Sequence, residues 1–93
     1  MIKTFKCKET EKIFRREYSR KLPHNVQGAA FRKLRMIDRS RTLNDLKIPP
    51  ANMLEKFSGK RKGQYSIRIN DQWRICFEWV DNNASRVEVV DYH

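Results

Sequence analysis

The last third of the chain, GQYSIRINDQWRICFEWVDNNASRVEVVDYH from Gly63 to His93, decides the fold. Three segments in it alternate apolar and polar residues, and two short polar stretches separate them. Because successive side chains of a strand point to opposite faces, a period of two predicts strands, here three antiparallel ones joined by compact turns. We therefore expect a three-strand meander with one apolar face and one polar face.

The alternation assigns the side chains of this meander to its two faces. The apolar set is Tyr65, Ile67, Ile69, Trp73, Ile75, Phe77, Trp79, Val87 and Val89. The polar set is Gln64, Ser66, Arg68, Arg74, Cys76, Glu78, Arg86, Glu88 and Tyr92. We expect the apolar face to form the core and the polar face to stay open. The polar face is either an ordinary solvated surface, which the alternation alone favours, or a candidate site built on Arg68, Arg74 and Tyr92.

Two helices are expected before the middle of the chain. From Lys8 to about Tyr18 the chain is rich in charged residues and has a narrow apolar stripe, which predicts a surface helix interrupted by Leu22-Pro23. From Pro23 to Arg39 apolar residues recur every three or four positions, which predicts an amphipathic helix. Its apolar stripe is Val26, Ala30, Leu34 and Ile37. Its basic residues, which form either a solvated face or a nucleic-acid contact surface, are Arg32, Lys33, Arg35 and Arg39.

The other segments are short. Ile2–Phe5 alternates and is expected to form a first strand, and Leu43–Leu46 predicts a short turn of helix. Ile48-Pro49-Pro50 predicts an extended connector without a regular element, because proline restricts the residue before it. Asn52–Phe57 is expected to form another strand. The next loop has three basic residues between two glycines and is either a flexible hairpin turn or a phosphate-binding loop. These residues are Lys60, Arg61 and Lys62.

The order strand, helix, helix, strand and meander predicts an α+β fold of two layers. We expect the N-terminal strand and two helices to pack on one face of a mainly antiparallel sheet and to leave the face of Arg74 open. A chain of 93 residues has the size of one domain, so residues 1–93 are expected to form a single domain.

The charge of the chain indicates its partners. There are 21 Lys and Arg against 11 Asp and Glu, a formal net charge of +10. Nucleic acid is the commonest anionic partner of a small basic domain. A membrane surface is disfavoured because the basic residues are scattered instead of lying on one widely apolar helix. The sequence has no apolar segment of signal-peptide or membrane-span length, so we expect a cytoplasmic protein.

The two cysteines, Cys7 and Cys76, are expected to be reduced and structural. They lie in different predicted elements and have no CxxC spacing. A zinc site needs about four ligands, and the sequence shows no such cluster. We expect no metal.

Four stretches carry a resemblance to a known family. They are MIKTF at residues 1–5, LNDLKIPP at residues 43–50 leading into Leu54, GKRKGQYSIRINDQWRICFEW at residues 59–79, and DYH at residues 91–93. On these stretches, which span nearly the whole chain, the sequence resembles the HigB-type toxins of the RelE/ParE superfamily of toxin–antitoxin pairs. The resemblance implies a RelE-like fold.

The resemblance also implies an activity. Relatives are ribosome-dependent endoribonucleases that cut messenger RNA in the aminoacyl site, with the neighbouring 2′-hydroxyl as the nucleophile and without a metal or other cofactor. Such chemistry needs a base, a cation beside the phosphoryl group and an acid for the leaving 5′-oxygen.

Six residues are candidates for these catalytic roles: Arg74, His93, Tyr92, Asp91, Lys56 and Glu55. Arg74 can hold the phosphate with its guanidinium fork, and His93 can transfer protons because an imidazole titrates near neutral pH. Tyr92 can stack on a base or orient the nucleotide, and Asp91 can orient His93. Lys56 and Arg68 can complete a cationic floor. The candidate RNA-binding residues are Arg68 and, in the glycine-flanked loop, Lys60, Arg61 and Lys62.

The chain departs from some relatives in one stretch. Those relatives have a catalytic histidine and lysine before the glycine loop, whereas this chain reads LEKFSGK at residues 54–60. Glu55 is therefore an alternative to His93 as the base.

The resemblance implies several partners as well. They are the ribosome with its RNA, messenger RNA, and a helix-turn-helix antitoxin of the HigA type, through which alone operator DNA is contacted. Two other functions remain open on the sequence: a non-enzymatic inhibitor of DNA gyrase, like the ParE branch, and a plain basic RNA-binding module.

Overall fold

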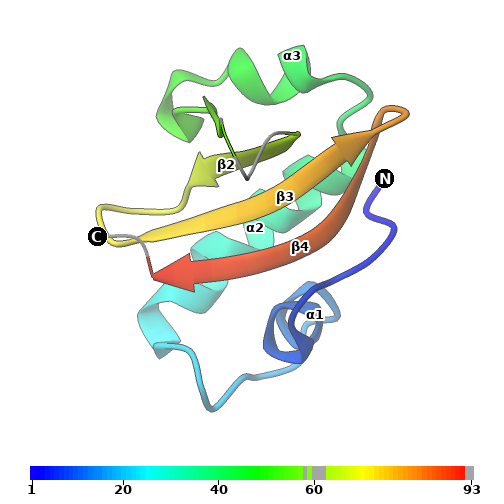
Figure 1. Cartoon of the computed structure of the whole chain (residues 1–93). Coiled ribbons are helices and arrows are strands. Elements are labelled where there is room, and N and C mark those ends of the chain that lie inside the picture. The colour runs from blue at the N-terminus through cyan, green and yellow to red at the C-terminus, as the bar shows by residue number, and fades with distance from the viewer. Residues whose placement is uncertain (58, 60–62, 92–93) are drawn as a thin grey trace.

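A computed structural model describes residues 1–57, 59 and 63–91 of the chain. The helices are α1 (Lys8–Phe14), α2 (His24–Arg39), α3 (Leu43–Lys47) and the 3₁₀ turn η1 (Pro50–Asn52). The strands are β1 (Glu55–Lys56), β2 (Gln64–Arg68), β3 (Trp73–Val80) and β4 (Asn83–Asp91). Figure 1 shows α2 behind the sheet, with α1 and α3 to either side of it. The predicted α+β class with its helices against one face of the sheet is confirmed.

The strands form one antiparallel sheet in the order β1-β2-β3-β4, which confirms the meander. β3 and β4 are joined by the two-residue turn Asp81-Asn82, and both residues have positive φ, at 51° and 62°. Such a pair is typical of a type I′ hairpin, whose twist matches that of the flanking strands. The turn between β2 and β3 is fixed by the Asn70 side chain, whose Oδ1 accepts hydrogen bonds from the backbone N–H groups of Gln72 and Trp73, each at 2.9 Å.

The N-terminal segment lies along the outer edge of β4. It pairs with β4 in parallel at the two isolated bridges Ile2–Ala84 and Phe5–Val87, and does not form a longer strand of its own. Four backbone hydrogen bonds of 2.7 to 3.1 Å join the segments, among them Lys3 N–H to the Ala84 carbonyl at 2.7 Å. The expected first strand is therefore limited to two bridges, and the segment covers an edge of β4 that would otherwise be open.

The core lies between α2 and the apolar face of the sheet. All four predicted stripe residues of α2 are buried, together with the strand residues that face them. The fully covered core side chains include Val26, Ala30, Leu34, Ile37, Ile67, Ile75, Phe77 and Val87. Phe77 is also in ring contact with Tyr65 and Trp79, with centroids 6.2 Å away in each case. Burial of each large side chain here stabilises the fold by about 1.5–3 kcal/mol, so the contact between α2 and the sheet supplies most of the core.

The first helix is shorter than predicted, because α1 ends at Phe14 and not near Tyr18. Arg16 has a left-handed backbone, with φ at 65°, which stops the helix. Tyr18 is 61% exposed, so it supplies little of the apolar contact that the prediction assumed.

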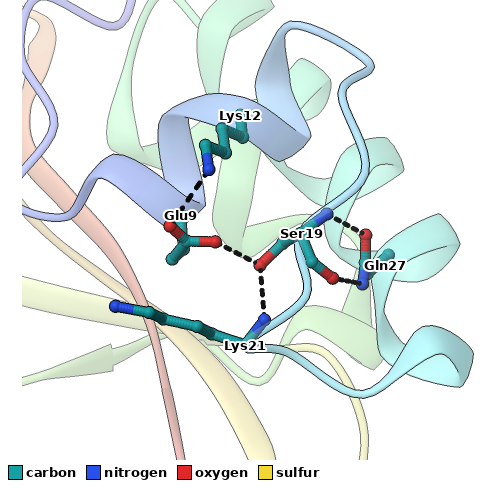
Figure 2. Close-up of polar contacts among 5 residues, drawn as sticks. All are labelled: Glu9, Lys12, Ser19, Lys21 and Gln27. Carbon is teal, nitrogen blue, oxygen red and sulfur yellow. Dashed lines mark hydrogen bonds and ion pairs between the residues drawn. The ribbon is translucent and has the colours of Figure 1, made fainter.

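A polar cluster replaces the missing helical turn, as Figure 2 shows. The fully buried Ser19 donates its hydroxyl proton to Glu9 Oε1 at 2.6 Å, and Glu9 also pairs with Lys12 at 3.4 Å. The backbone of Ser19 exchanges two hydrogen bonds with the Gln27 side chain, at 3.1 and 2.7 Å. The loop between the helices is thus tied to α1 through Glu9 and to α2 through Gln27.

The connector after α2 is more regular than predicted. The short helix α3 is confirmed, and the Asp45 carboxylate caps its start by accepting the backbone N–H groups of Arg41 and Thr42, at 2.8 and 3.2 Å. The prediction that the two prolines exclude a regular element is wrong, since Pro50 begins η1. Its fixed φ suits the first position of a helical turn, where its missing N–H costs nothing.

The strand predicted at Asn52–Phe57 is reduced to the two residues of β1. Asn52 is fully buried in η1, where its side chain donates to the Leu46 carbonyl at 3.0 Å and accepts from Lys33. Met53 then takes a left-handed backbone with φ at 43°. The side chain of Asn52 therefore holds the chain in a turn, and an extended conformation begins only at Glu55.

No helix in the described part of the chain is long and apolar enough to cross a membrane.

Candidate active site

Arg74 lies near the start of β3, on the face of the sheet opposite α2. Its register partners are Arg68 on β2 and Val90 on β4, and Ser66 and Cys76 lie on the same face. This face was expected to be open, and that expectation is wrong for its centre: Arg74 is 6% exposed, Cys76 4% and Ser66 0%. The segment from Met53 to Glu55 reaches across to Arg74 and helps to cover this face.

Neutral acceptors hold the Arg74 guanidinium in place. Its Nε–H donates to Ser66 Oγ at 2.8 Å, and Nη2 donates to the Met53 carbonyl at 2.6 Å and to the Ser66 carbonyl at 3.3 Å. The left-handed backbone of Met53 is the turn that leads from η1 to β1. Because donors on two edges of the planar group are engaged, both the position and the plane of the cation are fixed.

Glu55 brings a carboxylate to the same place. It pairs with Ser66 across the β1–β2 ladder and therefore shares the face of Arg74. Its Oε1 lies 3.9 Å from Arg74 Nη1, and its side chain is 47% exposed. The structure thus joins two of the predicted site residues, a fixed cation and a solvent-accessible carboxylate.

The other predicted members of the cationic floor divide between the faces. Arg68 lies beside Arg74 on the same face and forms an ion pair with Asp71. Lys56 is opposite Tyr65 in the ladder, so its side chain leaves β1 on the other face. The structure therefore brings Arg68 to the candidate site and directs Lys56 away from it.

Asp91 ends β4 opposite Trp73, which places it on the face opposite Arg74. Its Oδ2 accepts a hydrogen bond from Gln72 Nε2 at 3.1 Å. The remaining predicted site residues lie outside the described residues, so their roles stay predictions. They are Tyr92 and His93, and Lys60, Arg61 and Lys62 of the glycine-flanked loop.

Two residues of this arrangement had no assigned role in the sequence. Ser66 was placed on the polar face by alternation, but its bond to Arg74 depends on a register that pairs Ser66 with Cys76, next to Arg74. Met53 acts through its carbonyl, for which the sequence has no signal. Beyond Arg74 the same face has two ion pairs, Glu78–Arg86 at 3.2 Å and Lys6–Glu88 at 3.4 Å.

Lys33 of α2 contacts the segment that leads to the candidate site, through its hydrogen bond to Asn52. Burial lowers the pKa of Lys33, and the neighbouring charges of Arg32 and Arg68 lower it further. Lys33 donates to Asn52, so it supports the turn that positions Met53. Among the described residues no group of three or more His, Cys, Asp or Glu side chains is placed to hold a metal ion. The arrangement provides a fixed cation that can bind a phosphate and a carboxylate that can accept a proton.

Solved structures from two bacteria share this fold. The chain aligns over its full length with a chain of the YoeB–YefM complex from Staphylococcus aureus, at 25% identity and a TM-score of 0.62, covering 95% of that chain. A YafQ mutant from Escherichia coli aligns over 94% of this chain and 89% of its own, with a TM-score of 0.58 at 12% identity, which shows the fold alone. The class is thus the RelE-like fold.

Sequence relatives narrow the class. Residues 3–93 match the family model described as the RelE-like toxin of the type II toxin–antitoxin system HigB. Toxin HigB-1 of Vibrio cholerae is 40% identical over 85 residues, which are 90% of each chain. Endoribonuclease HigB of Proteus vulgaris is 28% identical over 93 residues and the full length of both chains. The chain belongs to the HigB-like toxin family, as the sequence motifs indicated.

Proposed function

We propose that this toxin is a ribosome-dependent endoribonuclease that cuts messenger RNA in the aminoacyl site and so stops translation. Membership of the HigB-like family and a relative named endoribonuclease support the coarser part, an RNA-cleaving toxin. The observation that carries the proposal is Arg74, a buried guanidinium fixed by Ser66 and Met53 with the Glu55 carboxylate 3.9 Å away.

The reaction is an internal transfer at phosphorus. The 2′-oxygen attacks the adjacent phosphate and gives its proton to a base, the bond to the 5′-oxygen breaks, and an acid protonates that oxygen. The products are a 2′,3′-cyclic phosphate and a 5′-hydroxyl. Arg74 is proposed to bind the phosphate as negative charge builds on its oxygens, a role in which a preorganised cation contributes several kcal/mol.

The proton-transfer roles fall to groups around Arg74. Glu55 is proposed as the base, because it is an exposed carboxylate on the same face. His93 is proposed as the acid, and Tyr92 as the side chain that stacks on a base or orients the nucleotide. Arg68 and the loop of Lys60, Arg61 and Lys62 are proposed to bind the flanking phosphates. Asp91 is proposed to orient His93 from the end of β4.

The proposed partners follow from the same family. A helix-turn-helix antitoxin of the HigA type is proposed to silence the toxin and to supply the contacts to operator DNA. The Staphylococcus aureus relative was solved in the complex named YoeB–YefM, which supports an antitoxin partner. We further propose that residues 1–93 act as one domain in the cytoplasm.

The test is to induce the protein alone in bacteria and to map new messenger-RNA 5′ ends. Ends confined to translated regions, and lost when initiation is blocked, are expected. Arg74→Ala and Arg74→Lys should lower cutting by about 10²-fold or more, since loss of one charge-stabilising donor costs about that much. Arg86→Ala is the matched control, because Arg86 pairs with Glu78 on the same sheet but lies away from Arg74.

Circular dichroism and urea unfolding confirm that the variants are folded. Equal cutting by Arg74→Ala and Arg86→Ala would contradict the proposed site. Intact messages together with altered plasmid supercoiling would replace the proposal with gyrase inhibition. Cutting of free RNA at the same rate as RNA on ribosomes would remove ribosome dependence.

A further inference from the structure

Asn52 is a fully buried polar side chain that contacts both α2 and α3, and no step of the proposed reaction uses it. Its Oδ1 accepts a hydrogen bond from Lys33 Nζ, and its Nδ2 donates to the Leu46 carbonyl at 3.0 Å and to Met36 Sδ at 3.1 Å. Leu46 lies in the last turn of α3, where carbonyl groups lack partners within the helix. Both ends of the Asn52 amide are therefore engaged, and the side chain joins the end of α3 to α2.

The next residue, Met53, has a backbone conformation that needs such an anchor. Its φ of 43° and ψ of 57° lie in the left-handed region, which residues other than glycine rarely adopt. The Met53 side chain is 56% exposed, so its own burial does not hold the backbone there. The Met53 N–H donates to the Pro50 carbonyl at 3.1 Å, which closes η1, and the Asn52 amide fixes η1 against α3. The direction of the Met53 carbonyl thus depends on the place of Asn52.

The Met53 carbonyl is a direct contact of the Arg74 guanidinium. It accepts a hydrogen bond from Nη2 at 2.6 Å, beside the bonds that Arg74 makes to Ser66. Since Arg74 is 6% exposed, a shift of this carbonyl must either move the guanidinium or deprive a buried charged donor of its acceptor. One continuous chain of contacts therefore leads from Lys33 through Asn52 and Met53 to Arg74.

We propose that Asn52 is a positioning residue for RNA cleavage: its buried amide holds the Met53 carbonyl, and that carbonyl aims the Arg74 guanidinium at the phosphate. This inference rests on the proposed function, because only a reaction at the phosphate requires Arg74 to be aimed. A misplacement of about 1 Å can slow a positioned reaction by about 100-fold. Asn52 is fully buried and touches no RNA in this proposal, so its loss should lower kcat and leave KM nearly unchanged.

The experiment measures kcat and KM for cleavage of a message on purified ribosomes. Asn52→Ala removes the whole amide. Lys33→Met removes only the hydrogen bond to Asn52 Oδ1, and it is judged by kcat alone because the lost charge can change KM. Val26→Ala is the matched control, since it opens a defect in the buried face of α2, about 10 Å along the helix from Lys33. Circular dichroism and urea unfolding confirm that each variant is folded.

Asn52→Ala is expected to lower kcat by about 10- to 100-fold and to change KM by less than about twofold. Lys33→Met should lower kcat by a smaller factor, and Val26→Ala should keep the kcat of the parent. In an Arg74→Ala background, Asn52→Ala should lower the rate by less than about twofold, because Asn52 acts through Arg74.

A merely structural role would slow Asn52→Ala and Val26→Ala alike, or would slow Asn52→Ala as much in the Arg74→Ala background as in the parent. Either result would overturn the proposal. If Asn52→Ala does not fold, an unchanged kcat in Lys33→Met would overturn it.

The position of the guanidinium is measured separately by NMR of the Arg74 Nε–H, which donates to Ser66 Oγ at 2.8 Å. Its exchange with solvent should be at least about tenfold faster in Asn52→Ala than in the parent, and unchanged in Val26→Ala. Faster exchange, in a protein whose parent form cuts no message, would support the positioning of Arg74 and reject the proposed function. Unchanged exchange in Asn52→Ala would overturn the positioning and leave the proposed function standing.

Discussion

The bond between Ser66 and Arg74 can be tested by a single atom change. Ser66→Ala removes the Oγ that accepts the Nε–H of Arg74 at 2.8 Å, in a place where Ser66 is fully buried and Arg74 nearly so. The serine carbonyl, which accepts Nη2 at 3.3 Å, and the Met53 carbonyl stay in place. The variant therefore deletes one of the contacts that fix the guanidinium plane and keeps the charge.

The cost follows from the burial of the charged donor. A hydrogen bond to a charged group contributes about 1.5–3 kcal/mol net, so Ser66→Ala should destabilise the protein by about 2 kcal/mol. With a urea dependence of about 1 kcal/mol per molar for a chain of this size, the midpoint should fall by about 2 M with an unchanged slope. The cleavage rate should fall by about 10- to 100-fold, because a loosely held cation no longer meets the phosphate in the reactive geometry.

Urea unfolding followed by tryptophan fluorescence measures the first effect, and cleavage of a message on ribosomes measures the second. Ser85→Ala is the control, since it removes a hydroxyl from β4 that has no hydrogen bond to another described residue. A stability loss no larger than that of Ser85→Ala would refute the energetic part of the reasoning. A loss of stability with an unchanged cleavage rate would refute the view that Ser66 orients Arg74 for the reaction.

Two further predictions concern stability. Gly28→Ala should stabilise the protein by about 0.5–1 kcal/mol, because Gly28 lies inside α2 and an added Cβ would meet only Arg32 Nη1, at 3.7 Å. A lower unfolding temperature of the variant would show that the backbone at this position needs glycine. Hydrogen bonds from the backbone N–H groups of Arg41 and Thr42 lower the pKa of Asp45 below its ordinary 3.8. The charged form of Asp45 therefore contributes stability above about pH 4, and this contribution is lost as the pH falls through the lowered pKa. In thermal unfolding, Asp45→Asn should be less stable than the parent protein at pH 7 and more nearly equal to it at about pH 2.5. An equal difference in stability at both pH values would contradict this prediction.

The elements that follow a single hydrophobic period were predictable from the sequence. The meander and α2 were right because burial of Ile75 or Leu34 depends on a local period of two or 3.6 residues. The end of α1 was not predictable in this way. It depends on Ser19, whose hydrogen bonds reach Glu9 and Gln27, ten and eight residues away.

The candidate site also has a part that the sequence predicted and a part that it did not. Alternation placed Arg74 and Arg68 on one face, and the family motif selected that face as the site. The burial of Arg74 was missed because it is produced by a different segment, the turn at Met53, which depends on the buried Asn52 side chain and its contacts with Leu46 and Lys33. The alternation of apolar and polar residues along a strand predicts the face of the sheet on which a side chain lies. Whether that face is buried depends on the path of a loop that the alternation does not describe.

The kind of partner that holds Arg74 is consistent with a catalytic use of its charge. Burying a guanidinium is costly, and a purely structural cation is usually compensated by a close carboxylate. Here Ser66 and the Met53 carbonyl orient the group through neutral acceptors, while Glu55 remains at 3.9 Å and half exposed. Ser66 and Met53 fix the geometry through acceptors that carry no charge, and a half-exposed carboxylate yields more easily to a phosphate than a buried one. These contacts therefore fix the position from which Arg74 can meet the phosphate that the proposed reaction brings.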